Sequence, residues 1–177
     1  MKKGIIITLI FLAFISCSER EKDFDSFEYS YAGTFSTVFS IKFSNSDTLF
    51  LREHWNRGGN ENFQFPKSKT NYFAILTEQQ KNELSSLIHK VNFKEMNSEY
   101  FEDYSDGSAF SIIIRKGDFE KKVFVHSHKI PKELDSLSGW IYYTKMKLIL
   151  TETKEKLEFE SVKALLPPPP PLPPILK

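Results

Sequence analysis

Cysteine is almost absent from this sequence, which has one among its 177 residues. A single cysteine excludes an internal disulfide scaffold and any zinc site built on a cluster of cysteines. An excess of charge of one sign is missing too, because 24 Lys+Arg balance 23 Asp+Glu. This balance excludes the broad basic surface of a nucleic-acid-binding protein, so no nucleic-acid partner is expected.

Enzyme signatures are also lacking. The chain contains no G-x-S-x-G and no H-E-x-x-H motif, and Gly58-Gly59 lacks the spacing of a phosphate-binding loop. No cofactor is therefore expected, and the sequence predicts a protein without catalytic activity.

Long hydrophobic runs are absent except for residues 5–15, which are apolar apart from Thr8 and follow Lys2 and Lys3. Eleven residues span about 16 Å as a helix, short of a hydrocarbon core of about 30 Å, so the run is typical of a signal peptide. It ends at Ser16-Cys17, a small residue followed by the only cysteine. Without Lys2 and Lys3 the 24 Lys+Arg fall to 22 against 23 Asp+Glu, a net charge of −1.

This N-terminal pattern resembles that of bacterial lipoprotein precursors. The resemblance implies that a signal peptide of residues 1–16 is cleaved and that Cys17 receives the lipid, so that the mature protein labels with palmitate. It further implies a lipid-anchored protein of the cell envelope, held at the outer membrane with its domain on the periplasmic or surface side; two or three acyl chains anchor a protein essentially permanently. Two alternatives stay open: an ordinary secretory cleavage after Ser18, which discards Cys17, and a free thiol at Cys17.

Composition divides the rest of the chain into three parts. Residues 17–28 begin with a polar, charge-mixed stretch and are predicted to be a flexible tether. Residues 29–162 are predicted to form a single α+β domain. Residues 163–177 contain seven prolines and are predicted to be a disordered tail that favours an extended polyproline II conformation.

Apolar residues at every second position predict strands. A first hairpin is expected around the turn at 44–47. One face of its first strand is made of Phe35, Thr37, Phe39, Ile41 and Phe43, and its second strand covers residues 48–55. Residues 72–76 read as another strand, and a second hairpin is expected over 108–126 around Gly117. Residues 151–160 read as a late strand or a helix extension.

Two helices are predicted between and after these hairpins. Thr77 with Gln80 forms a capping-box pattern that starts the first helix at Glu78. Pro131 suits the first turn of the second. Each helix carries an apolar stripe, made of Leu84, Leu87, Ile88 and Val91 in the first, and of Leu134, Leu137, Ile141 and Leu148 in the second.

The element order ββ(β)-α-ββ-α predicts an α+β fold, an antiparallel sheet of about five or six strands with two helices on one face. Together with the N-terminal pattern, residues 77–87 and the hairpin 108–126 resemble a broad class of small uncharacterised envelope lipoproteins that carry a domain of unknown function. This resemblance implies a fold class and no activity.

Three histidines are the candidates for metal binding. His126 and His128 are two residues apart, so on a strand they point the same way, and His54 at the end of another strand is the natural third ligand. A solvated strand end explains the same pattern without a metal, and this interpretation is favoured.

An acidic, aromatic stretch over 99–106 is the candidate for acid/base chemistry. It contains Glu99, Glu102, Asp103 and Asp106. Paired carboxylates hydrolyse glycosides when burial raises the pKa of one of them, and carboxylates also bind Ca²⁺. A solvated loop with its aromatic rings on the core has the same composition, and this interpretation is favoured.

Aromatic residues make up 15% of the chain, and most are expected in the core. Trp55 beside the glycine loop and Tyr142-Tyr143 are the candidates for an exposed surface that binds a glycan or a protein. The leading hypothesis is thus a non-catalytic binding module or accessory protein of the envelope. The alternatives are an assembly factor that uses its proline tail, and a small metal-dependent or carboxylate hydrolase that uses His126 and His128 or the 99–106 loop.

Overall fold

The computed structural model describes residues 23–44, 46–57 and 66–166. Within these residues one sheet has the strand order β5-β7-β6-β1-β2-β3-β4-β8, in which every neighbouring pair is antiparallel except β5 and β7. The strands are β1 Ser26–Gly33, β2 Thr37–Ser44, β3 Thr48–Asn56, β4 Thr70–Ile75, β5 Glu99–Phe101, β6 Ser108–Lys116, β7 Phe119–His126 and β8 Thr151–Thr153. The helices are α2 Glu78–Lys90 and α3 Lys132–Lys145, and η1 Ser161–Ala164 is a 3-10 turn.

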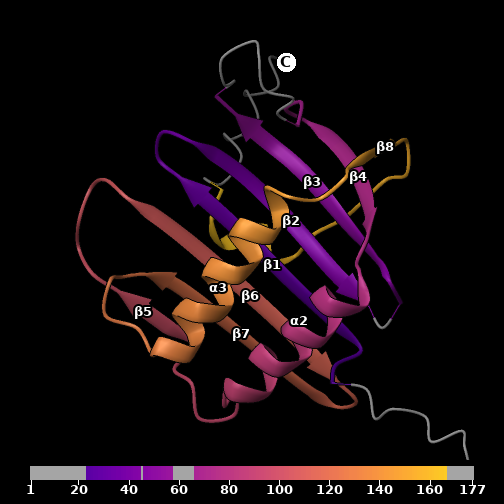
Figure 1. The fold of residues 1–177 in the computed structure, drawn as a ribbon. Helices are drawn as coiled ribbons and strands as arrows, with labels where there is room; N and C mark the ends of the chain where they lie inside the picture. Colours follow the sequence, from indigo (N-terminus) through magenta and orange to yellow (C-terminus); the bar gives the residue numbers. More distant parts are fainter. Residues whose placement is uncertain (1–22, 45, 58–65, 167–177) are drawn as a thin grey trace, which may run out of the picture.

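Helices α2 and α3 lie side by side on one face of the sheet, called here the front face, while the C-terminal segment passes behind it (Figure 1). The predicted α+β class with two helices is confirmed. The predicted number of five or six strands is wrong, because the described sheet has eight, and the order is ββββ-α-βββ-α-β instead of ββ(β)-α-ββ-α.

The missing strands have identifiable causes. Residues 26–33 form a separate central strand, β1, so 26–28 belong to the sheet and not to the tether predicted for 17–28. Phe35 lies in the turn after β1 and is 65% exposed, although its spacing from Phe39 placed it in a strand. Strand β5 has three residues, too few for an alternating pattern. Strand β8, also of three residues, lies within 151–160, where a late strand was one of the two expected structures.

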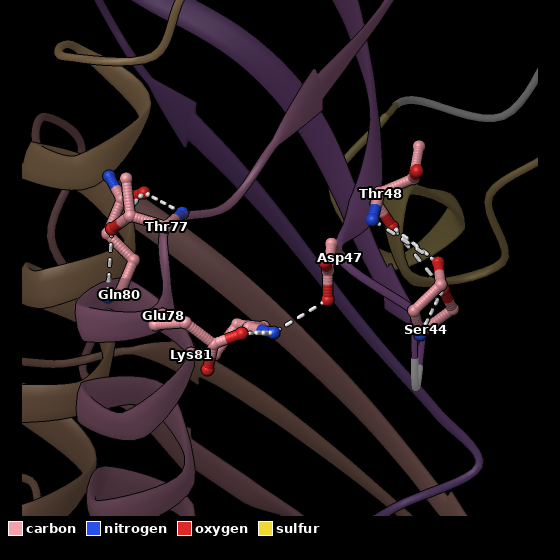
Figure 2. A network of polar contacts seen from close by, with 8 residues as sticks. Ser44, Asp47, Thr48, Thr77, Glu78, Gln80 and Lys81 are labelled. Atoms are coloured by element: carbon pink, nitrogen blue, oxygen red, sulfur yellow. Dashed lines mark hydrogen bonds and ion pairs between the residues drawn. The ribbon is translucent and has the colours of Figure 1, made fainter.

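The first hairpin and the first helix form as predicted. The turn between β2 and β3 carries Asp47, whose carbonyl accepts from the amide of Leu76 (2.8 Å) and whose carboxylate binds Lys81 (2.7 Å). Thr77 and Gln80 form the capping box at the start of α2, and Lys81 also pairs with Glu78 (Figure 2). These contacts fix the start of α2 against the β2–β3 turn.

The core lies between the helices and the front face of the sheet. Alternate residues of β1 and β2, such as Phe27, Tyr29, Phe39 and Ile41, are fully buried there. Helix α3 adds Leu134, Leu137 and Ile141. Pro131 caps this helix without a side-chain hydrogen bond. The helix ends at Lys145, so Leu148, which was predicted to continue the stripe, reaches the core from the segment that follows.

The back face of the sheet is polar under η1. Glu28 accepts from the amides of Glu160 (2.8 Å) and Ser161 (3.2 Å) and pairs with Lys42 (2.7 Å). A chain of hydroxyl contacts then runs across the strands, from Ser161 to Ser30 (2.7 Å) and from Ser30 to Ser40 (2.6 Å). With Phe159 and Val162 buried as well, this network holds the C-terminal segment on the back of the sheet.

Candidate binding groove

A groove of about 700 Å³ opens between α3 and the strands β1, β6 and β7. The strand pattern that builds the core also builds this groove, since Tyr29, Tyr31 and Phe110 come from the front-face positions of β1 and β6. Helix α3 contributes Tyr142 and Tyr143. The remaining polar groups at its wall include Ser127, His128, Lys132 and Asp135.

The aromatic rings of the groove contact one another. Tyr31 lies 4.9 Å from Tyr142 and stacks on Phe39, with 5.7 Å between centroids. Tyr29 stacks on Phe110 at 5.7 Å. These contacts hold the floor rigid, while Tyr143 at the rim is 67% exposed.

Burial affects the hydroxyl groups of two tyrosines of the groove, Tyr29 and Tyr142. Burial raises the pKa of Tyr29, whose hydroxyl is bonded to that of Ser138 (2.8 Å). Burial and the neighbouring Tyr31 raise the pKa of Tyr142. The groove therefore offers the neutral hydroxyl of Tyr142, which can both donate and accept hydrogen bonds, while the fully buried hydroxyl of Tyr29 is bonded to Ser138.

Glu102 fastens the 99–106 loop at one end of the groove. Its carboxylate accepts from the hydroxyl of Ser127 (2.9 Å) and the amide of His128 (2.8 Å), and it pairs with Lys129 (2.8 Å). These groups, Lys129 first, lower the pKa of Glu102 to about 2. An acid that hydrolyses glycosides needs a raised pKa, so Glu102 is suited to holding the loop and not to donating a proton.

The other carboxylates of this loop are not drawn together. Glu99 on β5, Asp103 and Asp106 are all exposed. Among the residues described by the structure, no group of three His, Cys, Asp or Glu side chains is placed to hold a metal ion. The geometry thus gives the predicted acid/base chemistry and Ca²⁺ binding no assembled site.

The three candidate histidines do not converge. The ring of Tyr104 lies against both His126 (4.1 Å between centroids) and His128 (5.0 Å, stacked). His54 is on β3, four strand positions from β7, about 19 Å at the usual strand spacing. Its Nε2 contacts the hydroxyl of Ser40 (2.9 Å), and burial, with Arg52, lowers its pKa to about 4. The proposed third ligand is therefore too far from the other two.

No family model and no curated protein matches this chain. Within the described ranges no helix is long and apolar enough to cross a membrane. Cys17 and the prolines from 167 onward lie outside the described residues, so their predicted roles stay predictions.

A buried ion pair beside the groove was not found from the sequence. Glu53 on β3 is fully buried, and its Oε2 lies 2.8 Å from the ammonium of Lys145 at the end of α3. The sequence does contain a signal that both residues face the core. Glu53 continues the two-residue spacing of Leu49 and Leu51, and Lys145 follows Ile141 by four residues.

Proposed function

We propose that this protein is a lipid-anchored binding module of the cell envelope that holds an envelope polysaccharide in the tyrosine groove, without catalysis. The observation that carries the proposal is the groove itself, about 700 Å³ in volume and walled by aromatic rings with hydroxyl groups. Aromatic side chains supply a large contact area, and a few placed polar groups fix the orientation of a ligand.

The chemistry of the wall suits a saccharide. A sugar ring has apolar C–H faces and a rim of hydroxyl groups, which match a tyrosine face and a few polar side chains that donate and accept hydrogen bonds. Tyr31, Tyr142 and Tyr143 provide rings, while Lys132 and Asp135 provide hydrogen-bonding groups. The near balance of charge in the chain suits a neutral ligand better than a nucleic acid or a strongly acidic polymer.

The anchor part of the proposal rests on the sequence around Ser16-Cys17. In cells given radiolabelled palmitate, we expect the parent protein to be labelled and Cys17→Ala to lose the label. Equal labelling of both proteins would rule out a lipid on Cys17 and leave the groove proposal intact.

The groove part is tested by co-sedimentation with purified peptidoglycan sacculi and by calorimetric titration with soluble N-acetylglucosamine oligomers. Tyr143→Ala is expected to weaken binding by about two- to tenfold, because a stacked aromatic contact is worth about 0.5–1.5 kcal/mol. Phe35→Ala is the matched control, since Phe35 is exposed to 65% and Tyr143 to 67% but Phe35 lies outside the groove. Binding that responds equally to both variants, or no binding to either probe, would refute a saccharide site in the groove.

A further inference from the structure

A second hollow, called here the back-face trough, crosses the sheet beyond η1. It has a volume of about 390 Å³. Ala32 pairs with Ala109 on β6 and with Val38 on β2, and Val38 pairs with Trp55 on β3. On β7, His126 is the residue after Val125, and Val125 pairs with Phe110, the residue after Ala109 on β6. His126 itself pairs with Phe101 on β5. One row of side chains thus runs in register across six strands.

A β-bulge sets the orientation of Trp55 in this row. The register of β2 and β3 shifts between Val38 and Phe39, so that Phe39 pairs with Glu53 while Val38 pairs with Trp55. The extra residue turns Trp55 to the back face, whereas Glu53 remains on the front. A regular ladder would instead place Trp55 on the front face with Glu53.

This row has small side chains at its centre and large ones at its ends. Ala32 and Ala109 form the centre of the hollow and Trp55 (41% exposed) lies at one side of it, while Phe101 (59% exposed) lies next to His126 at the far end of the row. Phe35, in the turn after β1, is 65% exposed, and the guanidinium carbon of Arg57 lies 5.9 Å from the centroid of its ring. Large apolar side chains gathered on one surface mark a binding site.

The 3-10 turn η1 lies close to the trough. Ser161 of η1 is bonded to Ser30, two residues before Ala32 on β1 and on the same face, about 7 Å away along the strand. The described chain ends at Leu166, and residues 167–177 follow with seven prolines. As polyproline II, eleven residues extend about 34 Å, and six strands are crossed in about 24 Å.

We propose that residues 167–177 lie across the back-face trough of the same molecule, with proline rings against Trp55. Proline-rich segments dock in grooves lined by aromatic side chains. The carbonyl groups of polyproline II make no internal hydrogen bonds, and an indole N–H is a donor only, so the two groups match. This occupant is independent of the saccharide groove, which lies on the front face.

The fluorescence of Trp55 can detect the contact between this residue and residues 167–177. The full chain with Trp140→Phe keeps Trp55 as its one tryptophan. We expect truncation after Leu166 to shift the emission of Trp55 to longer wavelength and to raise its acrylamide quenching constant. Added peptide 167–177 is expected to reverse both changes. Circular dichroism of the truncated protein checks that the fold is retained.

Two matched variants sharpen the test. Removing residues 175–177 keeps all seven prolines and is expected to leave the emission unchanged, whereas replacing the prolines of 167–171 by serine is expected to reproduce the truncation. Unchanged Trp55 emission after truncation at Leu166 would overturn the proposal. So would a shift in the full chain that depends on protein concentration, because the tail would then occupy a neighbouring molecule.

Discussion

At the scale of single residues, the most demanding feature is the ion pair between Glu53 and Lys145. Both side chains are almost fully buried. The other carboxylate oxygen of Glu53 accepts from the hydroxyl of Thr37, and the ammonium of Lys145 lies 4.6 Å above the ring of Phe39. Within the described part of the chain the ammonium of Lys145 is the one partner of Oε2, so Lys145 alone compensates the burial of this oxygen. Removing one partner of such a pair leaves a buried charge.

We therefore expect Lys145→Met to lower the free energy of unfolding by about 3–5 kcal/mol in urea titrations at pH 7. The double variant with Glu53→Gln is expected to recover much of this loss, because the uncompensated carboxylate is gone. Lys147→Met is the control, since Lys147 is exposed and lies just beyond the helix. A double variant as unstable as the sum of the two single variants would contradict coupling between these residues.

The pKa of Glu53 gives this prediction a pH dependence. Burial raises that pKa, against the opposing effects of Lys145 and Thr37. A carboxyl whose pKa is raised by folding contributes stability that is complete below its ordinary pKa, near 4.3, and is lost as the pH rises through the raised value. Without Lys145 this loss is larger, so Lys145→Met should cost more stability at pH 7 than at pH 4. An equal cost at both values would show that Glu53 does not ionise in this range.

At the scale of elements, the sequence predicted the helix starts and hairpin turns that are determined by residues close together in the chain. The capping box at Thr77, the hairpin turns at 44–47 and around Gly117, and the start of α3 after Pro131 all lie where they were expected. Strand β5 escaped because its pairing partner lies far along the chain and three residues carry no period. Strand β8 lies within 151–160, for which a late strand was one of two expected structures.

The C-terminal segment is an element whose attachment can be measured. Glu28 receives the amides of Glu160 and Ser161 and binds Lys42, so Glu28→Ala removes three contacts at once. We expect faster amide hydrogen exchange over 159–166 in this variant, while the amides of α3 keep their protection. Glu99→Ala is the control, because Glu99 is an exposed carboxylate on β5. Unchanged exchange over 159–166 would mean that buried Phe159 and Val162 hold the segment without Glu28.

At the scale of the whole molecule, the candidate sites were beyond sequence reasoning because each gathers residues from distant segments. The front groove joins Tyr31, Tyr104 and Tyr142, which belong to three separate parts of the chain. The trough joins Phe101 and Trp55 across six strands. Sequence analysis did select Trp55, Tyr142 and Tyr143 as exposed aromatic candidates, but it could not show that the sheet separates them onto opposite faces.

This separation predicts that the two proposed sites act independently. The sheet and its buried front layer lie between Tyr143 in the groove and Trp55 in the trough, and residues that are far apart and do not contact each other have additive effects. Truncation after Leu166 should therefore leave the affinity for N-acetylglucosamine oligomers unchanged, and Tyr143→Ala should leave the emission of Trp55 unchanged. The combined variant should show both defects at their single-variant size in calorimetry and fluorescence. A change in saccharide affinity on truncation would instead mean that the proline segment reaches the front face, where the rings of α3 offer it a second aromatic surface.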